Sequence, residues 1–174
     1  MSDINKKEQT KKILISVGES LSKVTPETKN MVQSFATNMK KHETIQLFNN
    51  HARDLFNIML ELETKLNITC NIKGYLYLFD KAIKINAKLP IDKFTLTILE
   101  YAVQIYSGDD KCIINMEIPD GKINVDNEFG LIRTKMFKDI WIQLDQSYKD
   151  TLMDTIIHLT TFAHVYFIQT ISES

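Results

Sequence analysis

The sequence is poor in cysteine, glycine, proline and tryptophan. Its 174 residues include two cysteines, five glycines, three prolines and one tryptophan. Cys70 and Cys112 are too few for a disulfide framework, and no signal or transit sequence is recognisable at the N-terminus, so we expect a reducing compartment. The scarcity of glycine and proline allows few tight turns, which favours helices over a many-stranded fold.

The chain also lacks an excess of charge of one sign. Its formal net charge is −1, with 44% hydrophobic and 25% charged residues, as is ordinary for one globular domain of this length. This balance gives no reason to expect nucleic acid as a partner. The aromatic residues follow apolar stripes and do not alternate with basic ones, so a base-stacking surface is not indicated either.

Catalytic and metal-binding patterns are missing as well. There is no glycine-rich phosphate loop, and the four histidines are not at metal-ligand spacing. His158 and His164 are six residues apart, on different faces of one helix, so we interpret them as core or interface residues. His51 and Asp54 are neighbours on a helix, which we interpret as a solvated pair. We expect no enzyme, metal or cofactor, unless His51, Asp54 or His158 converge in a pocket with other titratable groups.

What the sequence does contain is a long apolar stretch in its last third, residues 137–171. Asp145 or Ser147 can cap a helix there. The helix then carries an apolar stripe at steps of four, three, four and three, formed by Leu152, Ile156, Leu159, Ala163 and Tyr166. Further apolar residues fall outside the stripe, which is typical of a central helix in a bundle.

A membrane anchor is the rival interpretation of this helix. No formally charged residue stands between Asp154 and Glu173, which approaches the length that a bilayer requires. The polar residues His158, His164 and Gln169 and several threonines argue against it. We favour a buried core helix and expect no membrane association, and we leave open that the helix is an oligomer interface.

Further helices are predicted upstream, among them a short one from Tyr75 to Ile85. Thr25-Pro26-Glu27 is a helix start, with Met31, Val32, Phe35 and Met39 facing inward. A second helix carries an apolar stripe formed by Phe48, Ala52, Leu55, Met59, Leu62 and Leu66. The spacing of this stripe is typical of the contact between two antiparallel helices in a bundle. Asp92 is the predicted cap of a helix over 91–106 with an inward face of Phe94, Ile98, Ala102 and Ile105 or Tyr106. Ser107-Gly108-Asp109-Asp110 closes that helix.

The predicted fold is an all-α, single-domain bundle of five to seven helices. Residues 1–24 form an N-terminal helix or a partly ordered arm, and residues 25–174 form the bundle. A small β-hairpin near 112–126 stays open as an alternative to a surface loop, because Pro119-Asp120-Gly121 is a good turn sequence between two apolar runs.

Two segments carry a resemblance to known proteins. The first is Phe48-Asn49-Asn50-His51-Ala52-Arg53-Asp54-Leu55, and the second is Ile140-Trp141 followed by Leu144, a capping acid, Lys149, Thr151 and the apolar helix. Both resemble segments of uncharacterised small helical proteins of large nucleocytoplasmic DNA viruses. That family usually has a second tryptophan and a tyrosine-leucine pair where this chain has Met153-Asp154-Thr155-Ile156-Ile157. The resemblance implies a viral protein made in a host cell, and it brings no catalytic residues.

Two functions are compatible with these observations. The first is a non-enzymatic structural or virion-associated protein, located in the host cell cytoplasm or the virion, that contacts a protein partner or a second copy of itself. The second is a host-interaction module whose groove binds an amphipathic helix, in the manner of Bcl-2-like regulators. A deep groove between the 91–106 helix and the C-terminal helix would favour the second. The candidate interaction surface comprises Trp141, Tyr148, Phe162, Tyr166 and Phe167.

Overall fold

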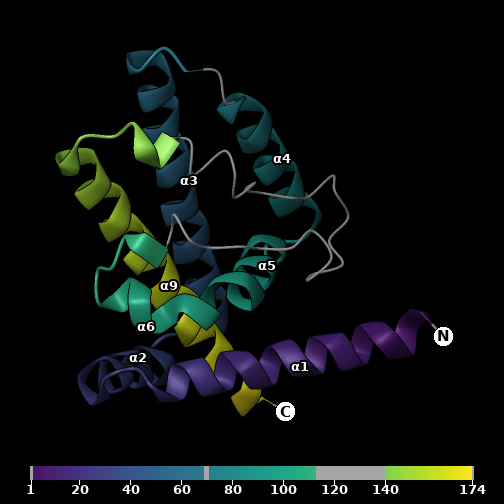
Figure 1. The fold of residues 1–174 in the computed structure, drawn as a ribbon. Coiled ribbons are helices and arrows are strands. Elements are labelled where there is room, and N and C mark those ends of the chain that lie inside the picture. Colours follow the sequence, from purple (N-terminus) through teal and green to yellow (C-terminus); the bar gives the residue numbers. More distant parts are fainter. Residues whose placement is uncertain (1, 69–70, 113–139, 174) are drawn as a thin grey trace.

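The computed structural model describes residues 2–68, 71–112 and 140–173. The elements in this part of the chain are helices (Figure 1): α1 (Ser2–Ser22), α2 (Pro26–Asn38), α3 (Lys41–Lys65), α4 (Ile72–Ile85), α5 (Leu89–Ile98), the 3₁₀ turn η1 (Leu99–Tyr101), α6 (Ala102–Tyr106) and α9 (Gln146–Ser172). The all-α prediction is confirmed. The hairpin predicted near 112–126 lies, apart from Cys112, outside the described residues.

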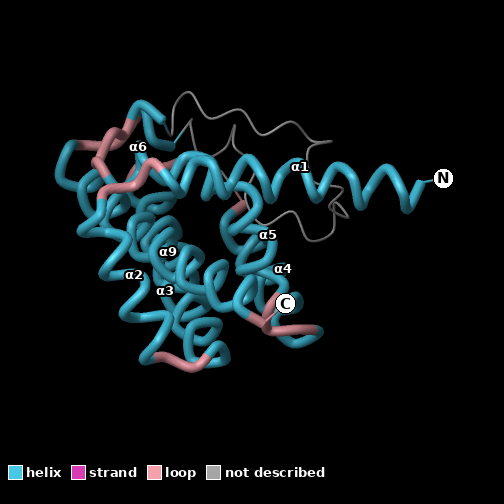
Figure 2. Tube along the Cα trace, turned by 90° about the horizontal axis from the view of Figure 1, so that it is seen from below, coloured by secondary structure: helices cyan, strands magenta, loops and turns pink. Residues whose placement is uncertain are grey.

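Helix α9 is the centre of the bundle. It packs against α2, α3, α5 and α6, and its C-terminal half lies among these helices (Figures 1 and 2). Leu152, Leu159 and Ala163 of the predicted stripe are at most 1% exposed, so the prediction of a central helix is confirmed. Asp145 does precede the helix, although its backbone carbonyl, and not its side chain, accepts the first amide hydrogen bonds. None of the described helices has the length and apolar character needed to cross a bilayer.

Helices α3 and α9 run antiparallel along most of their length. Their contacts occur in reverse order along the two helices: Lys41 with Glu173, Thr44 with Gln169, and Lys65 with Tyr148. The predicted α3 stripe is buried from Phe48 to Leu62. The predicted antiparallel helix pair is therefore confirmed. The opposite side of α3 contacts α4, where Phe56 and Phe79 have ring centroids 5.4 Å apart.

The predicted start of α2 is confirmed, but its inward face is not. Thr25 Oγ1 accepts a hydrogen bond of 3.3 Å from the Thr28 amide, and Pro26 is the first helical residue. Only Val32 of the predicted face is buried, whereas Met31 and Phe35 are 43% and 40% exposed. The reason is that α2 packs mainly on a single neighbour, α9, so a narrow strip of its surface is covered.

The prediction for 91–106 was wrong in two respects. Helix α5 begins at Leu89, so Asp92 lies inside its first turn and is not a cap; its carboxylate accepts a hydrogen bond from the Tyr166 hydroxyl at 2.5 Å. The helix is also interrupted by η1, and its buried positions are Ile91, Thr95, Leu99, Ala102 and Ile105. Phe94 and Ile98 are only half-buried. The helix has two neighbouring apolar stripes, and tertiary contacts determine which of the two is buried. Gly108, at φ +76°, follows α6 as predicted.

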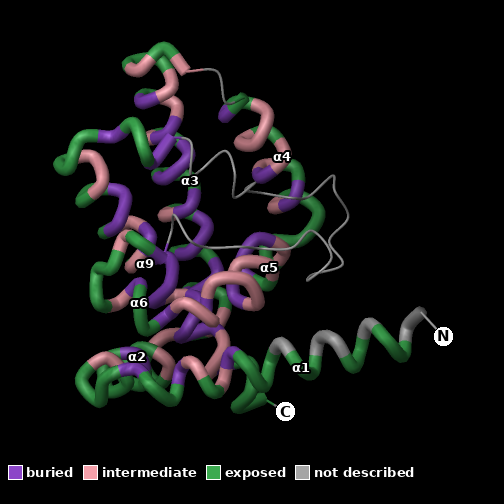
Figure 3. The backbone as a smooth tube through the Cα atoms, viewed as in Figure 1, coloured by how far each residue is buried: buried purple, intermediate pink, exposed green. Residues whose placement is uncertain are grey.

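Among the residues that the structure describes, helix α1 contacts the bundle near its C-terminal end. Among its described side chains, Val17 and Leu21 are buried, and Ser20 Oγ donates to the Glu100 carbonyl at 2.9 Å. The preceding residues project away from the other helices (Figures 1 and 3). We refer to residues 2–16 as the α1 arm.

Candidate interaction surface

The structure divides the five predicted surface residues into two groups. Trp141 is fully buried and Tyr166 is 5% exposed, whereas Tyr148, Phe162 and Phe167 are partly exposed. Trp141 and Tyr166 are therefore core residues and do not belong to an accessible surface. For Tyr166 the cause is the central position of α9, which turns much of its circumference towards other helices.

Phe162 takes part in an aromatic cluster that sequence reasoning missed. The His51 ring of α3 is stacked on the Phe162 ring at 5.2 Å between centroids and 25° between planes. The His158 ring, one turn before Phe162 on α9, has its centroid 5.3 Å from that of His51. His51 is half-buried and His158 is exposed. We predicted that His51 pairs with Asp54, its neighbour on the same helix. The contact with His158 could not be predicted, because the sequence does not indicate the register of α3 against α9.

Acidic residues flank this cluster. Asp54 lies three residues after His51 on α3, and Asp154 lies four residues before His158 on α9; both are exposed. We refer to the surface formed by His51, Asp54, Asp154, His158 and Phe162 as the α3–α9 face. Burial and the nearby His158 lower the pKa of His51, while Asp54 acts in the opposite direction. The described residues hold no group of three His, Cys, Asp or Glu side chains arranged to bind a metal ion.

His164 has a different role from His158. It is 3% exposed, and its Nδ1 lies 3.1 Å from the Tyr106 hydroxyl of α6. Burial lowers the pKa of His164 to about 4, and Lys29 contributes in the same direction. Burial also raises the pKa of Tyr106. The interpretation of His164 as a core histidine is confirmed, whereas His158 lies at the surface.

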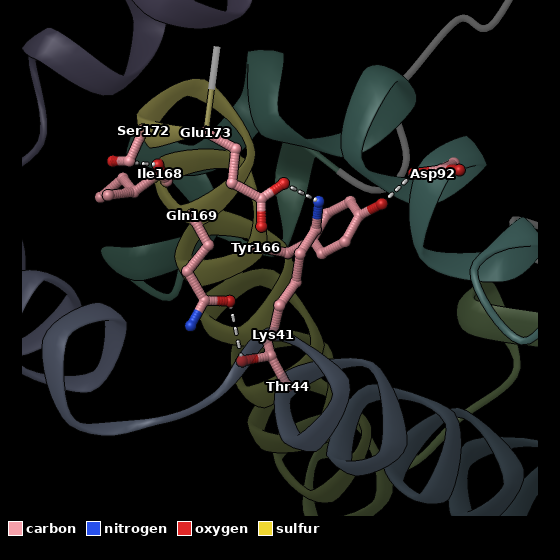
Figure 4. A network of polar contacts seen from close by, with 8 residues as sticks. All are labelled: Lys41, Thr44, Asp92, Tyr166, Ile168, Gln169, Ser172 and Glu173. Atoms are coloured by element: carbon pink, nitrogen blue, oxygen red, sulfur yellow. Dashed lines mark hydrogen bonds and ion pairs between the residues drawn. The ribbon is translucent and has the colours of Figure 1, made fainter.

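A buried polar network fixes the C-terminal end of α9 (Figure 4). The Gln169 amide donates to the Met39 carbonyl at 2.8 Å and accepts from the Thr44 hydroxyl at 3.0 Å. Lys41 forms an ion pair of 2.8 Å with Glu173 on the rim. One glutamine side chain thus satisfies groups at the junction of α2 and α3, where the helix ends leave backbone carbonyls without helical partners.

A shallow cavity of about 300 Å³ lies beside this network, between α2 and α9. Much of its polar lining is engaged within the protein: Lys41 with Glu173, Gln169 with Met39 and Thr44, and Ser172 with the Ile168 carbonyl. These groups hold three helices together. The cavity is therefore a structural feature of the network and not our candidate for ligand binding.

The space between α5–α6 and α9 is bridged by side chains. Tyr166 reaches Asp92 on one side, and His164 reaches Tyr106 on the other. A deep groove at this place would favour the host-interaction alternative. Because these two contacts join α9 directly to α5 and α6, the arrangement does not favour the host-interaction module.

The chain has a relative among known proteins. It is 45% identical, over 169 residues, to a protein of Acanthamoeba polyphaga mimivirus named uncharacterized protein R465, and the match covers 96% of this chain and 94% of the relative. No family model matches the chain, and no solved structure matches it. The similarity thus extends over nearly all of the chain and goes beyond the two segments that the sequence singled out.

Proposed function

We propose a function from the premise that this chain belongs to the same family as the uncharacterized protein R465 of Acanthamoeba polyphaga mimivirus. The proposed role is that of a non-enzymatic viral protein that works through protein–protein contacts, as a structural or virion-associated component in the host cell cytoplasm or the virion. The observation that carries this proposal is the α1 arm.

The α1 arm exposes apolar side chains on a stretch of helix that projects away from the other described helices. Ile4, Leu14 and Ile15 are 63%, 41% and 55% exposed. An isolated helix of this length is only marginally stable in water, because most helical stability in proteins comes from packing an apolar face. A helix of this kind gains stability when its exposed apolar residues are covered by a partner.

The partner we favour is a second copy of the chain, on grounds of charge. Residues 2–16 contain four lysines and two acids, so they carry a net charge of +2, and the rest of the chain carries −3. Two arms would repel each other, whereas an arm and the body of another copy attract. Electrostatic complementarity of this kind favours the encounter and sets the orientation of the complex.

The test is the mass of the full-length, tag-free protein in solution, measured by light scattering over a range of concentrations. We expect a closed oligomer. Ile15→Lys places a charge on the exposed apolar side of the arm, and we expect it to weaken association at least about tenfold, as the loss of a central contact does. Raising the salt concentration should also weaken association, because it screens the attraction.

Ile85→Lys is the matched control. Ile85 is an exposed isoleucine, at 62%, at the end of α4, and its replacement adds the same charge away from the arm. The proposal is overturned if the wild-type protein stays monomeric, or if both variants change association equally. Association that strengthens with salt would overturn the charge argument and indicate pairing of the arms.

A further inference from the structure

The geometry points to a binding site for one divalent transition-metal ion on the α3–α9 face, with the imidazoles of His51 and His158 as its two protein ligands. This inference does not depend on the α1 arm. It rests on the placement of two rings from helices that are distant in sequence, on the contact that orients one of them, and on the charge around them.

The spacing of the two rings fits a shared ion. Two imidazole nitrogens at about 2.0–2.1 Å from a tetrahedral zinc ion place the ring centroids about 5.2 Å apart. The observed separation of the His51 and His158 centroids is 5.3 Å. The rings come from neighbouring antiparallel helices whose register is fixed by contacts at both ends, so their separation does not depend on a loop.

The surroundings prepare these rings for a cation. Phe162 stacks against His51 and restricts its orientation, which reduces the ordering that binding would otherwise require. Neither ring has a hydrogen-bond partner in the part of the chain that the structure describes, so ring nitrogens there are available as ligands. The exposed carboxylates of Asp54 and Asp154, one turn away on each helix, add negative charge.

The ligand type defines the class of ion. Neutral imidazole suits zinc, copper and nickel, whereas calcium and magnesium prefer oxygen ligands. The lowered pKa of His51 keeps more of this ring in the neutral form that binds a metal. Two ligands leave a tetrahedral ion incomplete, and water or the same two histidines of a second copy supply the remaining positions.

Titration calorimetry with zinc chloride on tag-free, reduced protein tests the site. Removing a residue that only supports a metal ligand lowers metal affinity about 10–100-fold. Removal of the ligand itself should cost at least as much, so we expect His51→Ala and His158→Ala each to lower the zinc affinity at least about tenfold. The double variant should bind no more tightly than either single one. We expect Asp54→Asn to cause a smaller loss, and magnesium chloride to give no binding at these residues.

His42→Ala is the matched control, because His42 is an exposed histidine at the start of α3, the helix that carries His51. The zinc affinity of this variant should equal that of the wild type. A stoichiometry of one ion per chain supports a site completed by water, and one ion per two chains, with a matching rise in mass, supports a site shared by two copies. The inference is overturned if zinc does not bind, or if binding persists unchanged in the double variant. Circular dichroism spectra should show that the variants remain folded.

Discussion

Helices α9 and α1 are both long, with 27 and 21 residues, and the fold treats them in opposite ways. Helix α9 is in contact with α2, α3, α5 and α6, and eleven of its residues are buried. Helix α1 reaches the bundle near one end, and the buried ones among its described side chains are Val17 and Leu21. Helix α9 consequently contributes eleven residues to the core, whereas the described side chains of the α1 arm lie outside it.

The difference teaches that helix length does not by itself assign a role. Isoleucine and leucine recur along α9, whereas α1 has none between residues 5 and 12, and burial also depends on how many neighbours each helix has. Apolar area removed from water stabilises a fold by about 25 cal/mol per Å². That contribution is large along α9 and confined to one end of α1. Three predictions sharpen this contrast, beginning with the largest expected effect.

The first compares one leucine in each helix. Leu159 of α9 is 1% exposed and Leu14 of α1 is 41% exposed. We expect Leu159→Ala to lower the free energy of unfolding by about 2–5 kcal/mol, because it removes packed methyl groups and leaves a cavity. Leu14→Ala, the control, should change it by less than about 0.5 kcal/mol. Urea unfolding measures both, and equal losses would contradict the assignment of Leu14 to an unsupported arm.

The second concerns the pH dependence of stability. His164 of α9 has a pKa of about 4 in the folded protein and an ordinary value of 6.5, while α1 contains no histidine. The unfolded chain therefore binds more protons between these values. The stabilisation from a neutral His164 is complete above pH 6.5 and is lost as the pH falls through about 4.

That loss amounts to about 3 kcal/mol. The variant His164→Asn should show a flatter fall in unfolding free energy between pH 6.5 and pH 4 than the wild type, as followed by urea unfolding at several pH values. Asparagine keeps a polar group near the Tyr106 hydroxyl but does not titrate. Parallel curves for the two proteins would contradict a depressed pKa at His164.

The third concerns the polar network at the end of α9. We expect Gln169→Leu to lower the free energy of unfolding by about 1–3 kcal/mol, because the Met39 carbonyl and the Thr44 hydroxyl lose their partner. Gln46→Leu, on the exposed side of α3, is the control and should have little effect. Equal stability of the two variants in urea would show that the network does not hold the helix ends together.

Much of the fold could be predicted because its signals are local. The cap formed by Thr25 and Pro26, the break at Gly108, and the stripe from Phe48 to Leu62 depend on residues near one another in the chain, and the structure confirms them. The error over 91–106 occurred where two neighbouring stripes were equally apolar. Burial of Ile91 and Leu99 in place of Phe94 and Ile98 depends on how α9 and α1 pack against this segment.

The sequence by itself determined that the chain is helical and that its last helix is central, since helical periodicity and a continuous apolar circumference are local properties. Tertiary structure decided which of these residues are reachable. It buried Trp141 and Tyr166, left the described side chains of the α1 arm exposed, and brought His51 beside His158. The physical reason is that the register between helices distant in sequence is set by packing of the whole bundle, which no single segment encodes.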